Sequence, residues 1–390
     1  MREDVRAWIR EDLEAIERLQ LRRVLANRES PHVAGLVQID GRQYIGFGSN
    51  DYLGLSADTR LIEAIRQAAG YIGCGSAASP LISGHGVIHA RLERELTVFE
   101  HAEASLMFPT GYAANVGTIG ALVSKPDAIF SDERNHASII DGCRLSGARI
   151  HVYRHADLDH LTHLIGAAGS FRRKMIVSDS LFSMDGDFAP LPGLVKIARD
   201  CQAMLMIDEA HATGVFGDNG RGLCEHFDVE KEVDVRVGTL SKALGSFGGF
   251  VVGDRELIEL ILNRARTYIF STAQPEAIAN ATIAALEIVL AEPERRQRLL
   301  KMSEHLRHRL VADGWNIGTS TSQIVPIIVG EADRAMALCD QLKVLGFFVP
   351  GIRPPSVPAG MSLLRVSVTA SHTREMIDRF CDSLASLRQS

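Results

Sequence analysis

A lysine and an aspartate each follow a short strand-like run of residues. Lys242 lies in the glycine-flanked segment 238–245, after the run 233–237, and Asp208 directly follows the run 204–207. A lysine amine can form a Schiff base with an aldehyde, and a carboxylate can hold a ring nitrogen in its protonated form. The pair therefore predicts a site for pyridoxal 5′-phosphate, whose protonated ring accepts electrons.

Other polar residues after the strand-like runs could complete this site. His211 follows Asp208 closely and could hydrogen-bond the phenolic oxygen of the cofactor, although a histidine there is as often structural. His136 begins a helix-like segment and could stack on the ring, or could simply cap that helix. Ser183 and Thr239 could donate hydrogen bonds to the cofactor.

The segment 110–115 is a candidate for binding the phosphate. It follows the strand-like run 105–108 and contains Gly111 and Tyr112 among small residues. Small residues let backbone N–H groups approach an anion, and the dipole at a helix start favours negative charge. A plain strand-to-helix turn is the alternative interpretation.

The four residues 208–211 spell Asp-Glu-Ala-His, which is also the signature of a class of helicases. Those enzymes need a phosphate loop that contains Gly-Lys, and this dipeptide does not occur in the sequence. The net charge of -6 gives no general attraction to nucleic acid or to anionic membranes. We therefore exclude a nucleic-acid motor and expect neither a nucleic-acid nor a membrane partner.

The order of apolar runs and amphipathic segments predicts an α/β fold. Between about residues 60 and 280, helix-like segments alternate with short apolar strands, which indicates a mainly parallel sheet with helices on both faces. The expected strands are 105–108, 128–131, 149–153, 175–178, 204–207, 234–238 and 250–253. Such a sheet binds its ligands at the carboxyl ends of the strands.

Three parts of the chain are expected. Residues 1–46 should form one amphipathic helix, running to about residue 30 and ended by Pro31, and a hairpin that turns at Asp40-Gly41. Residues 47–280 should form the large cofactor-binding domain. Residues 281–390 should form a smaller α+β domain, which follows a long helical connection over 275–310.

The location of the protein is predicted from what the sequence lacks. The first residues carry mixed charge without an apolar signal core, and no apolar run reaches the ~18 residues of a membrane span. The six cysteines are scattered, as is typical of reduced thiols. We therefore expect a cytoplasmic protein.

Taken together, several ordered segments resemble the α-oxoamine synthases, which are pyridoxal phosphate enzymes of the aspartate aminotransferase fold. The resemblance extends from about residue 20 to the end of the chain. The matching segments are 49–54, 110–115, 136–138, 182–187, 208–214, 220–222 and 239–242.

This resemblance assigns roles to individual residues. It implies that Lys242 carries the Schiff base, that Asp208 pairs with the pyridinium and that His136 stacks on the ring. It also implies a homodimer with the active site at the subunit interface. The remaining implied cofactor contacts are Gly111, Tyr112, Ser183, His211 and Thr239, with Ser271 and Thr272 reaching the phosphate of the neighbouring subunit.

Members of the family condense an amino acid with an acyl thioester and release carbon dioxide. The resemblance implies that Asn50 meets the substrate and that Arg365 clamps the amino acid carboxylate, since a guanidinium suits that planar contact. A surface salt bridge is the alternative for Arg365. Released Lys242 is the expected general base.

The segment 351–360 resembles the biotin-pathway branch of the family in its Arg-Pro-Pro sequence. That branch uses L-alanine and a pimeloyl thioester, carried by coenzyme A or by an acyl carrier protein. By this match Ser356 contacts the substrate, and either Arg22 or Arg23 meets the acyl chain. The sequence of the loop 73–84 differs from the one common in this branch, so a sister branch such as the glycine acetyltransferases is the alternative. A non-catalytic subunit of the same fold is disfavoured by the presence of Lys242.

Overall fold

The computed structural model of the protein describes residues 6–19, 21–31 and 33–388. The chain divides into two compact units, residues 50–300 on the one hand and residues 1–49 with 301–390 on the other. The boundaries between the units thus fall after residues 49 and 300, whereas the sequence predicts domain boundaries after residues 46 and 280. The N-terminal segment shares a unit with the C-terminal residues because β2 (Arg42–Gly46) pairs in parallel with β11 (Phe347–Phe348).

The unit formed by residues 50–300 contains a seven-stranded sheet in the order β3-β9-β8-β7-β6-β4-β5. Its strands are β3 (Ala104–Phe108), β4 (Ala128–Asp132), β5 (Arg149–Tyr153), β6 (Lys174–Asp179), β7 (Met204–Asp208), β8 (Val235–Thr239) and β9 (Gly249–Gly253). The pairs from β5 across to β8 are parallel, and β9 is antiparallel to both of its neighbours. The predicted mainly parallel α/β sheet is confirmed, with each predicted strand within one residue of its observed ends.

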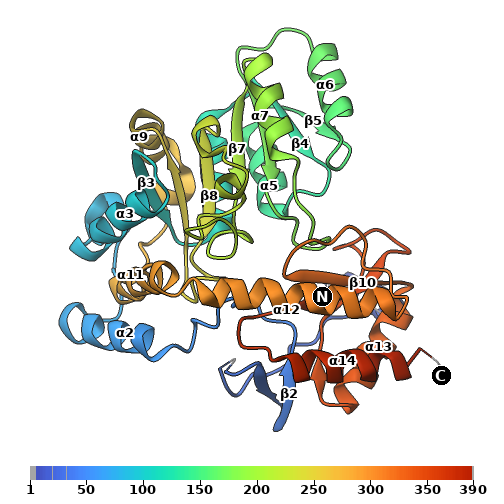
Figure 1. Ribbon diagram of the computed structural model, residues 1–390. Coiled ribbons are helices and arrows are strands. Elements are labelled where there is room, and N and C mark those ends of the chain that lie inside the picture. Colours follow the sequence, from blue (N-terminus) through green and yellow to red (C-terminus); the bar gives the residue numbers. More distant parts are fainter. Residues whose placement is uncertain (1–5, 20, 32, 389–390) are drawn as a thin grey trace. The chain divides into compact units, whose positions relative to one another are not determined.

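Helices cover both faces of this sheet (Figure 1). The helices are α2 (Thr59–Ile72), α3 (Val87–Phe99), α4 (Gly111–Leu122), α5 (Ala137–Ser146), α6 (Leu158–Ala167), α7 (Leu191–Asp200), α8 (Leu223–His226), α9 (Arg255–Arg264), α10 (Arg266–Ile269) and α11 (Glu276–Ala291). Helix α4 packs against β8, β9 and the helices α5, α9 and α10, whereas α6 and α7 pack on the strands β4 to β7.

The inner strands β4, β6 and β7 consist mainly of apolar residues, as expected for strands that are buried on both faces. Ile129, Met175, Met206 and Val235 come from four neighbouring strands and belong to one buried cluster. The polar residues that end these strands therefore emerge together at one edge of the sheet.

The unit formed by residues 1–49 and 301–390 contains two three-stranded sheets, in the orders β1-β2-β11 and β10-β13-β12. Its remaining strands are β1 (Leu36–Ile39), β10 (Ile324–Gly330), β12 (Gly351–Ile352) and β13 (Ser362–Ser367), and its helices include α13 (Ala332–Val344) and α14 (Arg374–Ser386). The predicted hairpin is confirmed: Asp40 and Gly41 both have positive φ, 48° and 75°, as a two-residue hairpin turn requires.

The predicted N-terminal helix is too long. Helix α1 covers Ala7–Arg18 and ends well before Pro31. The amide of Leu21 donates to the carbonyl of Ile16, which closes the helix end. The amide of Glu29 then donates to Gln38, so this part of the chain is extended beside β1 instead of helical.

The helical connection predicted over 275–310 is two helices, α11 and α12 (Glu294–Ala312). They are separated at Pro293, which has no amide hydrogen to continue the first helix. Within the described residues, no helix combines the length and the apolar character that crossing a membrane requires.

Candidate active site

Three neighbouring strands of the large sheet end in polar residues. Asp179 ends β6, Asp208 ends β7 and Thr239 ends β8, and Asp179 pairs in register with Asp208. Lys242 lies three residues beyond the end of β8. The parallel strands thus bring the predicted Lys242 and Asp208 to the same edge of the sheet.

The amine of Lys242 faces an imidazole. Nζ of Lys242 lies 2.8 Å from Nε2 of His211, and Nδ1 of the same ring lies 2.7 Å from the phenol oxygen of Tyr52. The phenol donates to Oδ1 of Asn50 at 3.2 Å, so its oxygen accepts the Nδ1 proton of His211. Nε2 of His211 then presents a lone pair to Lys242. Lys242, His211 and Tyr52 thus form one hydrogen-bonded line along which a proton can be held or passed, and Asn50 accepts the hydrogen bond at its end.

Asp208 is almost completely buried, with 4% of its surface exposed. Its Oδ1 accepts the amide of Ala210 at 2.7 Å, and its Oδ2 accepts Nδ2 of Asn115 at 2.6 Å. These two donors hold the carboxylate in position and leave lone pairs for a further donor.

The adjacent carboxylate of Glu209 is used differently. It accepts the hydroxyl of Ser180 at 2.6 Å and the backbone amides of Leu223 and Cys224 at 3.0 and 2.6 Å. These bonds fix the start of α8 to the sheet. Because Glu209 is engaged by the chain itself, Asp208 is the acid of the two that can face a ligand.

Asn115 joins Asp208 to His136. One amide hydrogen goes to Asp208, and the other goes to the hydroxyl of Ser138 at 2.9 Å. That hydroxyl lies 2.7 Å from Nδ1 of His136, and the amide of Ser138 donates to the same nitrogen. Nδ1 is therefore an acceptor, and the proton of the neutral ring is on Nε2.

The protonation of His136 follows from the same surroundings. Desolvation lowers the pKa of His136 below its usual value, opposed by the charge of Asp208 and assisted by the charge of Lys242. The backbone amide of His136 donates to Asp179 at 2.6 Å. Burial and the nearby charge of Asp208 raise the pKa of Asp179 well above its usual value. A neutral ring is thus held in a fixed position at the start of α5.

The start of α4 lies against the end of β8. Thr110 caps this helix by accepting the amide of Ala113 at 3.0 Å, which leaves the amides of Gly111 and Tyr112 pointing out of the first turn. A β-carbon on Gly111 would come within 3.3 Å of the Thr239 side chain, and one on Gly249 would lie 2.6 Å from the amide nitrogen of Gly111. The glycines allow a close approach, and the exposed amides suit an anion.

Other predicted cofactor residues lie in loops of the same unit. Ser183 is half-buried in the connection between β6 and α7. Ser271 is half-buried and Thr272 is exposed, between α10 and α11. The side chain of Tyr112 extends to Asp141 on α5, with which it forms a hydrogen bond.

The predicted substrate residues apart from Asn50 belong to the other unit. Arg365 is buried on β13, where Nη1 donates to the hydroxyl of Ser367 at 2.9 Å. Ser356 is exposed in the segment before β13, and its amide donates to the carbonyl of Arg353. Arg22 is exposed and forms an ion pair with Glu17 at 2.8 Å, and its neighbour Arg23 is exposed as well.

Four residues of the site received no individual role from the sequence: Tyr52, Asn115, Ser138 and Asp179. The first three lie inside segments that carry the family resemblance, and Asp179 directly follows a predicted strand. Their position was therefore a usable signal. Their partners could not be predicted, because each contacts a residue that is distant in the sequence or in another element.

The donor set fits pyridoxal phosphate. A primary amine, a buried carboxylate and a neutral imidazole lie at one edge of the sheet, with outward-pointing helix amides nearby. In addition, Oδ1 of Asn115 is buried beside this carboxylate without a hydrogen-bond partner among the described residues. An unsatisfied buried acceptor is costly, and a polar ligand would compensate for it. Within the described residues there is no cluster of histidine, cysteine and acidic side chains that could hold a metal ion.

Comparison with known proteins agrees with this geometry. Residues 42–384 match the family described as aminotransferase class I and II. The chain belongs to this family. Curated relatives named 8-amino-7-oxononanoate synthase include one from Symbiobacterium thermophilum, 45% identical over 94% of each chain. Another, from Anaeromyxobacter dehalogenans strain 2CP-1, is 45% identical over 97% of this chain and 95% of its own.

Solved structures show the same fold. Serine palmitoyltransferase from S. paucimobilis, described with a bound pyridoxal phosphate adduct, has a TM-score of 0.93 at 30% identity, covering 99% of this chain and 98% of its own. An 8-amino-7-oxononanoate synthase from Francisella tularensis has a TM-score of 0.78 at 29% identity, covering 89% and 98%. The aminotransferase fold predicted from the sequence is thereby confirmed.

Proposed function

We propose that the protein is a pyridoxal phosphate-dependent 8-amino-7-oxononanoate synthase of biotin biosynthesis. It condenses L-alanine with a pimeloyl thioester and releases 8-amino-7-oxononanoate, carbon dioxide and the free thiol. The observation that carries the proposal is the 45% identity with relatives of that name over nearly the whole chain. The pairing of Lys242 with Asp208 at the end of the sheet supports it.

The residues that would hold the cofactor are distributed around the ends of β6, β7 and β8. Lys242 would bind its aldehyde carbon, Asp208 its ring nitrogen and His136 one face of its ring, while His211 and Ser183 would contact its phenolic oxygen. The amides of Gly111 and Tyr112, with the hydroxyl of Thr239, would hold its phosphate. When bound, pyridoxal phosphate supplies an electron-accepting ring that stabilises negative charge at the amino acid α-carbon.

The residues of the chain supply the proton transfers and the orientation. Lys242 takes the α-proton of the amino acid once its amine is free, and Nε2 of His211 at 2.8 Å accepts and returns that proton. Tyr52 holds the Nδ1 proton of His211, so that the ring offers its other nitrogen to the lysine. Asp208, which accepts two hydrogen bonds, would face the ring nitrogen and favour the protonated form of that ring.

Substrate binding is assigned through the family resemblance. Arg365 would clamp the carboxylate of L-alanine, and Asn50 would contact the same substrate. Ser356 and either Arg22 or Arg23 would meet the acyl substrate, whose carrier is coenzyme A or an acyl carrier protein. The enzyme would act as a cytoplasmic homodimer, with Ser271 and Thr272 reaching the phosphate of the neighbouring active site.

Another α-oxoamine synthase activity is the second candidate. The backbone is more similar to serine palmitoyltransferase, with a TM-score of 0.93, than to the 8-amino-7-oxononanoate synthase structure, with 0.78. The sequence of the loop 73–84 differs from that common in the biotin-pathway branch, and this loop is where the preference for the acyl chain would differ. The sequence identity of 45% against 30% favours the first candidate.

One assay separates these functions. Purified enzyme is supplied with L-alanine and pimeloyl-CoA, with glycine and acetyl-CoA, and with L-serine and palmitoyl-CoA, and the release of free thiol and of the amino ketone is measured. We expect the first pair to have the highest kcat/KM. A higher kcat/KM for either other pair would keep the cofactor and overturn the proposed substrates. Lys242→Ala, which lacks the amine, serves as the blank.

A further inference from the structure

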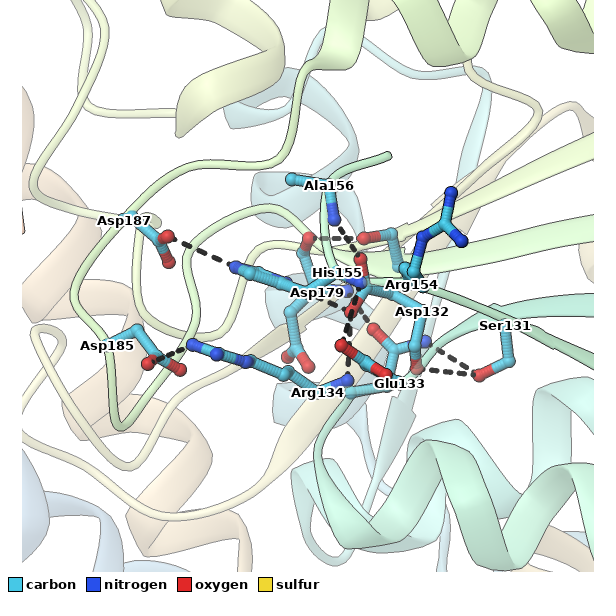
Figure 2. Close-up of polar contacts among 12 residues, drawn as sticks. Ser131, Asp132, Glu133, Arg134, Arg154, His155, Ala156, Asp179, Asp185 and Asp187 are labelled. Carbon is cyan, nitrogen blue, oxygen red and sulfur yellow. Dashed lines mark hydrogen bonds and ion pairs between the residues drawn. The ribbon is translucent and has the colours of Figure 1, made fainter. Parts of the chain in front are cut away.

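A cluster of charged side chains lies beside the site and takes no part in the proposed chemistry. It is the His155 cluster, formed by His155, Asp132 and Asp187 (Figure 2). Nδ1 of His155 lies 3.1 Å from Oδ1 of Asp132, and Nε2 lies 3.1 Å from Oδ2 of Asp187. An imidazole nitrogen must carry a proton to donate to a carboxylate, so His155 between two carboxylates is an imidazolium.

The two carboxylates come from different segments. Asp132 ends β4 and begins the connection 132–136, which leads to His136. Asp187 belongs to the connection 180–190, which contains Ser183. His155 itself follows β5, and its ring packs edge-on against Phe182 with the centroids 4.4 Å apart. One half-buried side chain thus joins three connections between strands and helices.

Both carboxylate oxygens of Asp132 also accept hydrogen bonds from backbone amides. Oδ1 accepts the amide of Arg134 at 2.8 Å, and Oδ2 accepts the amide of Ala156 at 2.9 Å. These bonds fix the start of the connection whose last residue is His136. A second ion pair, from Arg134 to Asp185, joins the same two connections nearer to solvent.

We propose that His155 is a positioning residue of the active site, whose doubly bonded imidazolium holds the segments of His136 and Ser183 in a fixed relative position. The inference rests on the proposed function, because it takes these two residues as cofactor contacts. His155 acts through Asp132 on the first segment and through Asp187 and Phe182 on the second.

The charge state of His155 is stable at neutral pH. Burial disfavours the charged ring, but the hydrogen bonds to Asp132 and Asp187 outweigh burial and raise the pKa of His155 to about 9. The titratable and charged groups around the ring are Asp132, Asp179, Asp185, Asp187, Glu133, Arg134 and Arg154 (Figure 2). Above pH 9 the ring keeps one proton and can donate to only one of the two carboxylates.

Hydrogen exchange tests the inference without reference to catalysis. The variant His155→Asn can reach only one carboxylate, and His163→Asn, at an exposed histidine of α6, is the matched control. Backbone exchange is measured by mass spectrometry with and without pyridoxal phosphate. We expect His155→Asn to accelerate exchange in peptides 132–140 and 180–190 and to leave peptide 204–208 of β7 unchanged. Its affinity for pyridoxal phosphate should fall about tenfold.

The pH dependence separates positioning from a merely structural role. In the unsubstituted protein, exchange in peptides 132–140 and 180–190, corrected for intrinsic rates, should rise as pH passes about 9. In His155→Asn this step should be absent. Equal exchange in His155→Asn and His163→Asn, or acceleration throughout the chain, would overturn the inference.

A second variant and a separate activity measurement complete the test. If His155→Asn fails to fold, Asp187→Asn removes one carboxylate and leaves the Asp132 contact in place. A chain that binds pyridoxal phosphate but turns over none of the substrate pairs would contradict the proposed function alone. The exchange result would still decide the role of His155 in holding the two segments.

Discussion

His136 and His155 are two histidines near the same edge of the sheet, and the protein holds them in opposite states. Nδ1 of His136 is an acceptor for a hydroxyl and an amide, and the pKa of this ring is lowered. Both nitrogens of His155 donate to carboxylates, and the pKa of this ring is raised to about 9. Desolvation acts on both rings in the same direction, so the bonded partners decide the outcome.

The comparison indicates how the site separates two tasks. A neutral ring suits stacking on a cofactor, because it adds no positive charge beside a ring that must itself remain protonated. A charged ring suits the joining of segments, because hydrogen bonds between ions are the stronger kind. Asn115 and Ser138 lie between the carboxylate of Asp208 and Nδ1 of His136, and desolvation lowers the pKa of this ring.

Removal of the reacting amine should have the largest effect on this site. In Lys242→Ala, turnover should fall by about 10⁴-fold or more, because no other amine replaces the lysine. The cofactor absorbance should shift, since the covalent attachment is lost. Absorbance and product release measured together check this result. An unchanged cofactor spectrum in Lys242→Ala would contradict the assignment of the site.

The adjacent acids Asp208 and Glu209 provide the next test. Asp208→Asn should lower kcat by about 10²- to 10³-fold, because the ring nitrogen loses its anionic partner. Its free energy of unfolding should fall by about 1 kcal/mol as well, because one oxygen of a buried carboxylate that accepts two donors becomes an amide nitrogen. Glu209→Gln should lower the free energy of unfolding by about 1–3 kcal/mol, since a buried acceptor of two backbone amides is replaced. Steady-state kinetics and thermal unfolding of both variants are the measurements. If Glu209→Gln lowered kcat more than Asp208→Asn does, Glu209 and not Asp208 would be the partner of the ring nitrogen.

Tyr52→Phe tests the line of side chains behind Lys242. Without the phenol, Nδ1 of His211 loses its partner, so the tautomer that faces Lys242 is no longer fixed. We expect kcat to fall by about tenfold or more and the pH profile of kcat to shift, with little change in KM for L-alanine. The full pH profile is the check. A profile that coincides with that of the unsubstituted enzyme would exclude this role for Tyr52.

The stability contributed by His155 should depend on pH in the opposite way to that of a salt-bridged acid. Its pKa in the folded chain is raised to about 9, above the value of about 6.5 expected when unfolded. The contribution is therefore complete below pH 6.5 and is lost as pH rises to about 9, up to about 3 kcal/mol. Chemical unfolding at pH 6.5 and pH 9.5 measures it, with His155→Asn as the reference that should show a smaller loss.

The smallest effect is expected from the control substitution. His163→Asn lies on an exposed position of α6 and should change the free energy of unfolding by less than about 0.5 kcal/mol. The same unfolding experiments test it. A larger change would mean that α6 is more sensitive than its exposure indicates, and the result for His155→Asn would then need a different reference.

The sequence was most informative where a buried strand ends in a polar residue. The strand 204–207 was predicted to within one residue of its observed end, and Asp208 was singled out because four apolar residues precede it. The first helix was predicted too long, because amphipathic spacing continues past Arg18 while the hydrogen bonds of Leu21 and Glu29 end it. Local patterns of this kind do not include the competing partners offered by the rest of the chain.

Partners across the site could not be read from the sequence. Asn115 and Asp208 are far apart in the chain, and nothing in their spacing indicates a hydrogen bond of 2.6 Å. His155 follows a strand, as His136 does, yet the two carboxylates that it contacts belong to different connections between strands and helices. The protonation state of a histidine is therefore a property of the folded chain, and the sequence alone supplies only the candidates.

Asn115 sets a limit on how far this site can be redesigned. Its amide has two hydrogens, and both are used, one by Asp208 and one by Ser138. Aspartate has nearly the same shape but no hydrogens to give, so it would place a second carboxylate against Asp208 and favour protonation of one of the pair. Laboratory evolution toward new amino acid or acyl substrates should therefore accept changes in the loop 73–84 while retaining asparagine at position 115.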